Sequence, residues 1–520
     1  MTTTLIVWGA SSGAGKSLLA TALCRWAARQ GMAVRPFKAQ NMSNNARVVQ
    51  GLGGELGEIG SAQYFQALAA RAVPHVDMNP VLLKPERDTA SQVLVQGRVV
   101  PELGLQPWRE RSAVLAEAAR QSFDRLWDGL SNGSAGVPGH GRGEAPGLIV
   151  VEGAGSPAER NLAAEDYVNL GVARWAQARG RCRALLVSDI DRGGSFAHLY
   201  GTWALLPADL QPLLAGFVLN KFRGDPALLA PGPQQLQGLT GVPLLGVLPM
   251  VRDHGLPEED GQSGPARVMP TGLTVAIVAT PHISNLDEFQ PLQAAAAVRW
   301  VRRADEVDGA DWVVLPGSKQ VSGDLAWLRA QGLDAAIVRH AQAGRPLLGV
   351  CGGLQMLGQQ LADPDGVDGE PFAQRDGLGL LPLATRYGAP KRLRAEPVRF
   401  AANWPGEGAV PGLQGGHSPW RALAGLRWSA YEIRCGRTEA VGASTAAPVL
   451  WDAQGQPIGW CGGPSGNVLG IATHGLFETA AALRALCGRQ VRTLDDSLDG
   501  LADLVEEHLG AAPLRALIRC

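Results

Sequence analysis

The chain has 520 residues, of which 46% are hydrophobic and 18% charged, and its formal net charge is -1. This length exceeds what a single hydrophobic core usually serves, so two or three domains are expected. The balanced charge argues against nucleic acid as the main partner, and no apolar run reaches the length of a membrane span.

Short apolar strands alternate with helical patterns over the first half of the chain. The expected strands are 4–8, 33–37, 147–153, 184–189, 215–220 and 243–249. The expected helices lie near 17–30, 58–72, 108–129 and 164–179, and a Gly/Pro-rich surface loop is expected at 131–147. This alternation predicts a parallel sheet covered on both faces by helices.

The stretch GASSGAGKS (9–17) joins the first expected strand to the first expected helix, which is the context of a P-loop. Lys16 is expected to reach the β- and γ-phosphates, and the Ser17 hydroxyl to bind Mg²⁺. The strict pattern has Gly at the position of Ala10, and Gly9 supplies it one residue earlier in an expanded loop. The alternative is a chance glycine-rich turn. The candidate ATP-binding residues of the loop are Gly9, Ser12, Gly13, Ala14, Gly15, Lys16 and Ser17.

Two further polar stretches follow expected strands of the same sheet. Glu152 ends the strand in VVEGAG (150–155), where a carboxylate suits Mg²⁺ or its water shell. FKAQNMSNN (37–45) brings Lys38 and a cluster of amides, including Asn41, to the sheet edge at which open α/β folds bind ligands. The alternatives are a carboxylate that only caps the sheet and an ordinary amide-rich loop.

A polar stretch at 252–272 predicts a linker, and a second α/β series follows it. The expected strands of that series are 273–280, 311–317, 346–353 and 467–475, with a Gly/Pro-rich excursion at 403–420. The whole chain is therefore expected to be an α/β protein, with a parallel sheet in its first half and a second region that has a sheet of its own.

The stretch LLGVCGGLQMLG (347–358) has the spacing of a nucleophile elbow, in which a sharp strand-to-helix turn exposes Cys351. The backbone N–H of Gly352 would help form an oxyanion hole, and Gly317 and Ser318 could supply a second donor. His474, at the end of another expected strand, is the candidate base, although a lone histidine there is more often structural. Together these residues suggest acyl transfer at an amide.

A thiol that hydrolyses an amide, combined with a nucleotide site, suggests ammonia from glutamine captured by an ATP-activated carboxylate. At this point the chain resembles the cobyric acid synthase family through nearly its whole length. The stretches that carry the resemblance are GASSGAGKS, FKAQNMSNN, GEIGSAQYFQALAAR, DMNPVLLKP, VEGAGSPAERNL, SDIDRGGSFA, LNKFRGD, LPGSKQVSGDLAWL, the Cys351 elbow, YEIRCGRT and THGLF.

The resemblance implies an α/β fold in which an N-terminal, dethiobiotin-synthetase-like P-loop domain is joined to a class I glutamine amidotransferase domain. The implied divisions are 1–251 for the ATP-binding amide synthetase, 252–272 for the linker, 273–485 for the amidotransferase and 486–520 for a helical tail. The implied reaction is ATP- and glutamine-dependent amidation of the b, d, e and g carboxylates of adenosylcobyrinic acid a,c-diamide, a step of cobalamin biosynthesis. L-glutamine and this corrinoid are the implied partners, and ATP and Mg²⁺ the implied cofactors.

By the same resemblance, Cys351 is the nucleophile and His474 its base. Lys16, Ser17 and Glu152 serve ATP and Mg²⁺. The resemblance also implies that Lys38 and Asn41 lie near the transferred phosphate or the substrate, and that Asn220 borders the adenine. Asp189 and Asp191 lie in a characteristic stretch, but the sequence gives them no role.

The chain departs from the common pattern at two positions. Class I amidotransferases commonly have Glu two residues after the catalytic histidine, where this chain has Leu476, as is usual in the cobyric acid synthase branch. The carboxylate nearest in sequence is Glu478, and we predict that it is not a substitute, since it opens a helical pattern that accounts for it. Arg434 stands where the family often has His.

Two rivals remain at this stage: the sister enzyme that amidates the a and c carboxylates, and a P-loop scaffold ATPase with a degenerate amidotransferase domain. Intact Cys351 and His474 disfavour the second. Seven scattered cysteines without a C-x-x-C pair fit a reducing compartment, and the N-terminus lacks the basic region of a signal peptide, so a cytoplasmic protein is expected. The oligomeric state cannot be derived from these patterns.

Overall fold

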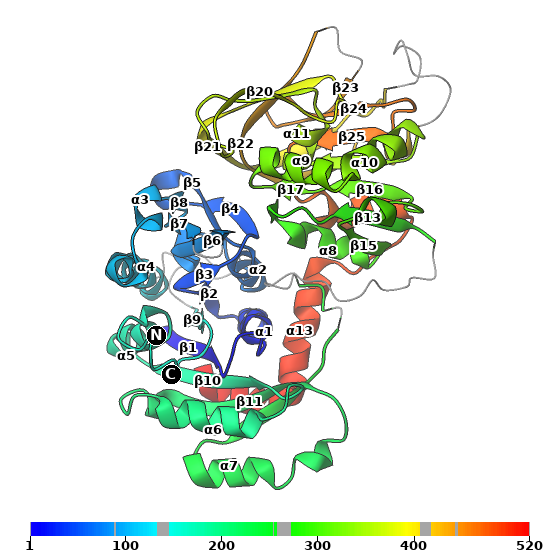
Figure 1. Ribbon diagram of the computed structural model, residues 1–520. Coiled ribbons are helices and arrows are strands. Elements are labelled where there is room, and N and C mark those ends of the chain that lie inside the picture. The colour runs from blue at the N-terminus through cyan, green and yellow to red at the C-terminus, as the bar shows by residue number, and fades with distance from the viewer. Residues whose placement is uncertain are drawn as a thin grey trace. The chain divides into compact units, whose positions relative to one another are not determined.

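The computed structural model of the chain describes residues 2–87, 90–132, 145–252, 254–256, 272–405, 418–442 and 446–518. It divides into two compact units, Met1–Glu259 with Leu494–Cys520, and Asp260–Thr493 (Figure 1). Most of the expected linker at 252–272 lies outside the described residues, as do large parts of the loop at 131–147 and of the excursion at 403–420.

The first unit is built on a six-stranded sheet in the order β12-β11-β10-β1-β9-β2, in which every pairing is parallel. Its strands are β1 (Thr2–Gly9), β2 (Ala33–Phe37), β9 (Gly147–Glu152), β10 (Cys182–Asp189), β11 (Leu214–Phe222) and β12 (Leu244–Pro249). All eight residues of β1 are buried, so both faces of the sheet are covered there. The predicted parallel-sheet architecture is confirmed, with each expected strand in place.

The helices of this unit are α1 (Lys16–Arg29), α2 (Ser61–Ala69), α3 (Pro101–Gly104), α4 (Trp108–Ser131), α5 (Val172–Arg179), α6 (Ser195–Leu205) and α7 (Gly232–Thr240). Two expected helices are shorter than their patterns. The one expected from residue 58 begins at Ser61, because the preceding residues form β5 (Leu56–Gly60). The one expected from 164 begins with a single π-helical turn at Tyr167–Gly171.

Two small sheets in the first unit were not predicted. One has the order β3-β6-β7-β8, formed by Gln40–Met42, Val81–Arg87, Ala90–Val95 and Arg98–Val99. The other pairs β4 (Ala46–Gln50) with β5 in antiparallel fashion. They hold the segments that follow β2, so they fix the position of the Lys38 and Asn41 stretch.

The end of the chain belongs to the first unit. Helix α13 (Leu494–Leu509), red in Figure 1, contacts α1, dark blue, and α14 (Ala511–Ile518) follows it. Arg25 of α1 is buried and forms an ion pair with Asp499 of α13 at 3.2 Å. Trp26 Nε1 donates a hydrogen bond to Glu506 Oε2 at 2.7 Å. The two helices therefore complete the core of the first unit.

The second unit contains an eleven-stranded mixed sheet. Its parallel part has the order β15-β13-β16-β18-β25, formed by Ala297–Val301, Thr274–Val278, Trp312–Leu315, Leu347–Val350 and Val468–Ile471. The sheet continues through β24 (Pro457–Gly462), β23 (Ala447–Trp451), β21 (Leu383–Phe400), β19 (Gln360–Asp363) and β20 (Phe372–Asp376), and β22 (Arg427–Ala440) pairs with β21. The helices are α8 (Gln290–Gln293), α9 (Val321–Ala330), α10 (Leu333–Gln342), α11 (Gly352–Leu357) and α12 (Ala480–Cys487).

A two-stranded antiparallel sheet stands apart from the main sheet of the second unit. It pairs β14 (Ile283–Ser284) with β17 (Gly317–Ser318). A 3-10 helix, Leu286–Phe289, follows β14 after Asn285, whose φ of 52° places it in the left-handed region. None of the helices among the described residues has both the length and the apolar character needed to cross a bilayer.

Candidate active sites

The loop between β1 and α1 closes around the ammonium group of Lys16. Its Nζ donates hydrogen bonds to the carbonyl oxygens of Ser11 at 3.0 Å and Gly155 at 3.1 Å. Glycine is favoured at position 9, because a Cβ there would lie 2.9 Å from the backbone carbonyl oxygen of Ser11 and equally close to Lys16. Gly15, with a φ of 99°, directly precedes α1, so the positive end of that helix faces the loop. Backbone N–H groups and one lysine at a helix N-terminus form a site suited to phosphate.

Glu152 is the centre of a buried polar group next to this loop, which we call the Glu152 cluster (Ser17, Lys38, Gln63, Gln66 and Glu152). Glu152 Oε1 accepts hydrogen bonds from Ser17 Oγ at 2.8 Å and from Lys38 Nζ at 2.9 Å. Gln66 donates to Oε2, and Gln63 Nε2 lies 3.5 Å from the same oxygen. Burial is the largest single influence and would raise the pKa of Glu152, but the Lys38 ammonium and the hydrogen bonds from Lys38, Ser17 and Gln66 together lower this pKa below its usual value. The carboxylate is therefore ionised.

Asn41 extends the cluster, because its Nδ2 donates to Gln63 Oε1 at 3.2 Å. Asn41 is 3% exposed and Lys38 4%, so both side chains lie inside the unit. Asn79 holds the segment in place by donating to the Lys38 carbonyl at 3.1 Å and accepting from the backbone N–H of Gly60. The predicted residues Ser17, Lys38, Asn41 and Glu152 are thus brought together.

The end of β11 contacts the phosphate loop from another side. Asn220 Nδ2 donates to the Ala14 carbonyl at 3.0 Å, and Lys221 Nζ donates to the Gly13 carbonyl at 2.7 Å. Lys221 also pairs with Asp189 Oδ2 at 3.0 Å, and its φ of 60° is unusual for a non-glycine residue. Asp189, which the sequence left without a role, therefore positions Lys221, whereas Asp191 forms an ion pair with Arg223.

Cys351 occupies the sharp turn between β18 and α11. Its φ of 51° and ψ of −102° are strained for a residue with a side chain. The turn is held by a hydrogen bond from Cys351 N to the Ile471 carbonyl at 2.8 Å. Glycine at 353 is required, since a Cβ there would lie 2.0 Å from the Leu315 carbonyl oxygen. The glycines after the thiol therefore allow α11 to start directly against β16.

The three predicted oxyanion-hole residues also lie together. A Cβ on Gly352 would be 2.6 Å from Ser318 N, so these two backbones touch. A Cβ on Gly317 would be 2.9 Å from His474 Cε1, which places β17 directly against the imidazole. Ser318 Oγ donates to Asp324 Oδ2 at 2.6 Å, and this buried carboxylate fixes the segment.

His474 is buried, and it contacts a carboxylate that the sequence did not suggest. Its Nδ1 lies 2.6 Å from Glu288 Oε1, and the backbone N–H of Gly475 donates to Glu288 Oε2 at 3.0 Å. The ring of Tyr431 stacks on the imidazole, with centroids 5.1 Å apart. Burial opposes the charged imidazolium, but Glu288 and Cys351 favour it, and the pKa of His474 is raised to about 10.

Glu478 is exposed, in a 3-10 helix that precedes α12. Arg434, where the family often has His, is buried and donates to Glu432 Oε2 at 2.7 Å and to the Gly436 carbonyl at 2.5 Å. Both of these contacts are with β22 itself, so they give Arg434 a structural role there.

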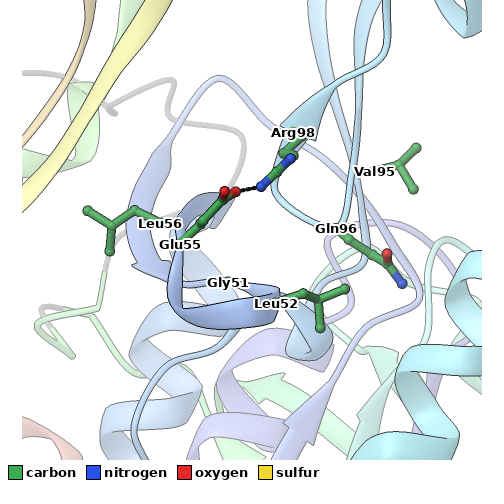
Figure 2. A pocket seen from close by; sticks show the side chains of 7 residues that line it. All are labelled: Gly51, Leu52, Glu55, Leu56, Val95, Gln96 and Arg98. Atoms are coloured by element: carbon green, nitrogen blue, oxygen red, sulfur yellow. Dashed lines mark ion pairs between the residues drawn. The ribbon is translucent and has the colours of Figure 1, made fainter.

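A separate pocket of about 270 Å³ lies in the first unit (Figure 2). The β4–β5 and β7–β8 turns form it, and Glu55 and Arg98 pair across it. Its lining contains none of the predicted site residues; it consists of Gly51, Leu52, Glu55, Leu56, Val95, Gln96 and Arg98.

Sequence reasoning missed Gln63, Gln66, Lys221 and Glu288. The first three lie within stretches that carried the family resemblance, so their motifs were a usable signal. Glu288 had none, because it lies 186 positions from His474 and its role depends on the fold.

Two family models match the chain. The CobQ/CobB/MinD/ParA nucleotide binding domain matches residues 5–263, and the CobB/CobQ-like glutamine amidotransferase domain matches residues 274–482. Each match corresponds to one of the two units and contains the candidate site described for it.

Curated proteins named cobyric acid synthase are similar over nearly the full length. The protein of Methylibium petroleiphilum is 55% identical, and the match covers 99% of this chain and 96% of that protein. The protein of Leptothrix cholodnii is 54% identical over 99% of this chain and 96% of its own length. That of Variovorax paradoxus is 54% identical over 99% of both chains.

Proposed function

Because the chain belongs to the cobyric acid synthase family, and is therefore a glutamine amidotransferase ligase of cobalamin biosynthesis, we propose that it amidates the b, d, e and g carboxylates of adenosylcobyrinic acid a,c-diamide. The portion 1–251 would activate each carboxylate with ATP, and the portion 273–485 would release ammonia from L-glutamine. The observation on which this proposal rests is the similarity to cobyric acid synthases over 99% of the chain. The two polar sites described above support the proposal.

In the ATP-dependent half, an oxygen of the corrinoid carboxylate attacks the γ-phosphorus while the bond to the β–γ bridging oxygen breaks. ADP leaves, and ammonia then displaces phosphate from the acyl phosphate to give the amide. Phosphoryl transfer depends on positioning and on stabilising negative charge. Lys16 would supply positive charge at the β- and γ-phosphates. Lys38, with Asn41 beside it, would orient the attacking carboxylate, and Asn220 would border the adenine.

Ser17 and Glu152 fit a magnesium ion. A hydroxyl and an ionised carboxylate lie 2.8 Å apart beside the phosphate loop, and Mg²⁺ prefers such oxygen ligands together with phosphate oxygens and water. When bound, the ion would neutralise charge on the phosphates. Since Lys38 shares Glu152 Oε1, a cation at this carboxylate would weaken that ion pair and free the ammonium group for the substrate.

In the glutamine-dependent half, the Cys351 thiol gives its proton to His474, and the thiolate attacks the side-chain carbonyl carbon of glutamine. N–H groups at Gly352 and the Gly317–Ser318 segment would stabilise the oxyanion. His474 returns the proton to the leaving nitrogen as the C–N bond breaks. Water then hydrolyses the thioester to glutamate and restores the thiol.

The test is mass spectrometry of cobyrinic acid a,c-diamide, in its adenosylated form, after incubation with ATP, Mg²⁺ and glutamine labelled in the amide nitrogen. The expected product carries four new labelled amides, and mass spectrometric fragmentation locates them at b, d, e and g. Conversion of cobyrinic acid at a and c, with no further amidation of the diamide, would assign the chain to the sister reaction instead.

A further inference from the structure

Glu288 is held on both of its carboxylate oxygens in the interior of the second unit. Its side chain is inaccessible to solvent, with His474 Nδ1 at 2.6 Å from Oε1 and the Gly475 N–H donating to Oε2 at 3.0 Å. Burying a carboxylate is costly unless it is paired and hydrogen-bonded. Both conditions are met here by two adjacent residues, so the carboxylate is fixed against the imidazole.

The bonding pattern determines which nitrogen of His474 carries a proton. An ionised carboxylate can only accept hydrogen bonds, so Nδ1 must be the donor. The second oxygen of Glu288 accepts the backbone N–H of Gly475, so both oxygens of this carboxylate act as acceptors. In neutral His474 the other nitrogen, Nε2, is then the one that can take a proton from the Cys351 thiol.

We propose that Glu288 is the positioning residue of His474: it fixes the imidazole tautomer and stabilises the imidazolium that forms when Cys351 becomes a thiolate. This rests on the proposed roles of Cys351 and His474. It also explains how His474 can have a carboxylate partner although Leu476 stands where class I amidotransferases commonly have Glu. The carboxylate comes from the 3-10 helix after β14 and not from the residues that follow the histidine.

Among the described residues, titratable side chains face His474 from several elements. Glu288 approaches from Leu286–Phe289, Cys351 from the turn before α11, and Tyr431 from β22, while Asp287 is buried beside Glu288. The raised pKa of His474 has Glu288 and Cys351 as its favourable causes. Removing the negative charge of Glu288 must therefore lower the pKa of His474 and weaken the thiolate–imidazolium pair.

The same short sheet links this carboxylate to the oxyanion segment. Glu288 follows β14, and β14 pairs with β17 through Ser284 opposite Gly317 and Ile283 opposite Ser318. A change in the position of this sheet would therefore move both the group that orients the base and the expected oxyanion donors.

The test compares Glu288→Gln with the control Glu478→Gln, which removes the exposed carboxylate that lies close to His474 in sequence. Glutamate release is measured from about pH 5.5 to about pH 11, a range that extends past the ordinary pKa values of histidine and a thiol and past the pKa of about 10 of His474, with folding checked by thermal melting. Glu288→Gln is expected to lower kcat on the order of 10²-fold, the lower end of what a well-positioned general acid–base contributes. The pH range over which kcat stays near its maximum should become narrower in this variant, because the thiolate–imidazolium pair is weaker. The acidic limb of the profile should move to higher pH and the alkaline limb to lower pH. Glu478→Gln should change kcat by less than about tenfold and keep the wild-type profile.

Two further variants separate the outcomes. Glu288→Asp keeps the charge on a shorter side chain, so it should recover part of the rate and most of the profile width. If Cys351→Ala still hydrolyses glutamine, the proposed function of this site fails. If Cys351→Ala is inactive but Glu288→Gln keeps the wild-type profile, or loses rate equally at every pH, the proposal for Glu288 alone is overturned.

Discussion

Replacing Gly317 with alanine tests how closely β17 must approach His474. The added Cβ would lie 2.9 Å from His474 Cε1 and 2.9 Å from Ser284 Oγ, which is about 0.5 Å less than the 3.4 Å at which ordinary contact begins. The Ser284 hydroxyl can rotate away. The imidazole cannot do so freely, because Glu288 holds Nδ1 and Tyr431 stacks on the ring.

Relief of this contact requires a shift of the imidazole or of β17 by about 0.5 Å. Since a misplacement of about 1 Å can cost about 10²-fold in rate, we expect a loss of about tenfold in glutamine hydrolysis, or ~1.4 kcal/mol in the barrier. The φ of Gly317 lies outside the range that disfavours side chains, so the loss should come from the contact and not from backbone strain.

The assay is steady-state release of glutamate by the purified protein. The matched control is Gly388→Ala in the same unit, where no atom lies within 4 Å of the added Cβ and φ is also ordinary. Wild-type turnover by Gly317→Ala, or an equal loss in Gly388→Ala, would refute the argument from close approach.

Three other substitutions test the remaining parts of the chain. Cys351→Ala should abolish amidation driven by glutamine but leave amidation with high ammonium, as measured by corrinoid product with each nitrogen source; product from glutamine would contradict the nucleophile assignment. Lys16→Ala should block amidation from both sources, because the carboxylate would no longer be activated, and ammonium-dependent product would refute the P-loop role. Leu501→Ala, in the core formed by α1 and α13, should destabilise the first unit by about 2–5 kcal/mol, so ATP-dependent activity should be lost at a lower temperature than glutamine hydrolysis; unchanged thermal inactivation would count against this packing.

The parallel sheets were predictable because their strands are short, continuous apolar runs. TLIVW and GLIVVEG could be recognised as strands from composition alone, because a strand buried on both faces is a nearly continuous apolar run and does not alternate with polar residues. The small sheets were not predictable in the same way. The strand Leu56–Gly60 contains two glycines and a glutamate, and its helical continuation from Ser61 dominates the pattern.

The candidate site residues also differ in how far the sequence alone could predict them. Lys16, Ser17 and Cys351 lie in local motifs whose spacing reflects a single turn of the chain, so the sequence was sufficient to find them. The proposed role of Glu288 depends on its contact with His474, which lies 186 positions away in sequence. Its own stretch, LDEF, does not differ from an ordinary acidic helix N-terminus. Lys221 lay in a recognised stretch, but its contact with the Gly13 carbonyl depends on the order of β10 and β11 in the sheet.

The packing of α13 and α14 on the first unit has a consequence for how the protein is made. A ribosome synthesises residues 494–520 only after the whole of Asp260–Thr493. Until then α1 lacks its partner helix, and Arg25 and Trp26 lack Asp499 and Glu506. The first unit is therefore completed only after the second unit has been synthesised, and until then part of its apolar core is exposed to water. A stop codon just after the amidotransferase portion would leave both sets of candidate site residues intact and still deprive helix α1 of its partner helix α13.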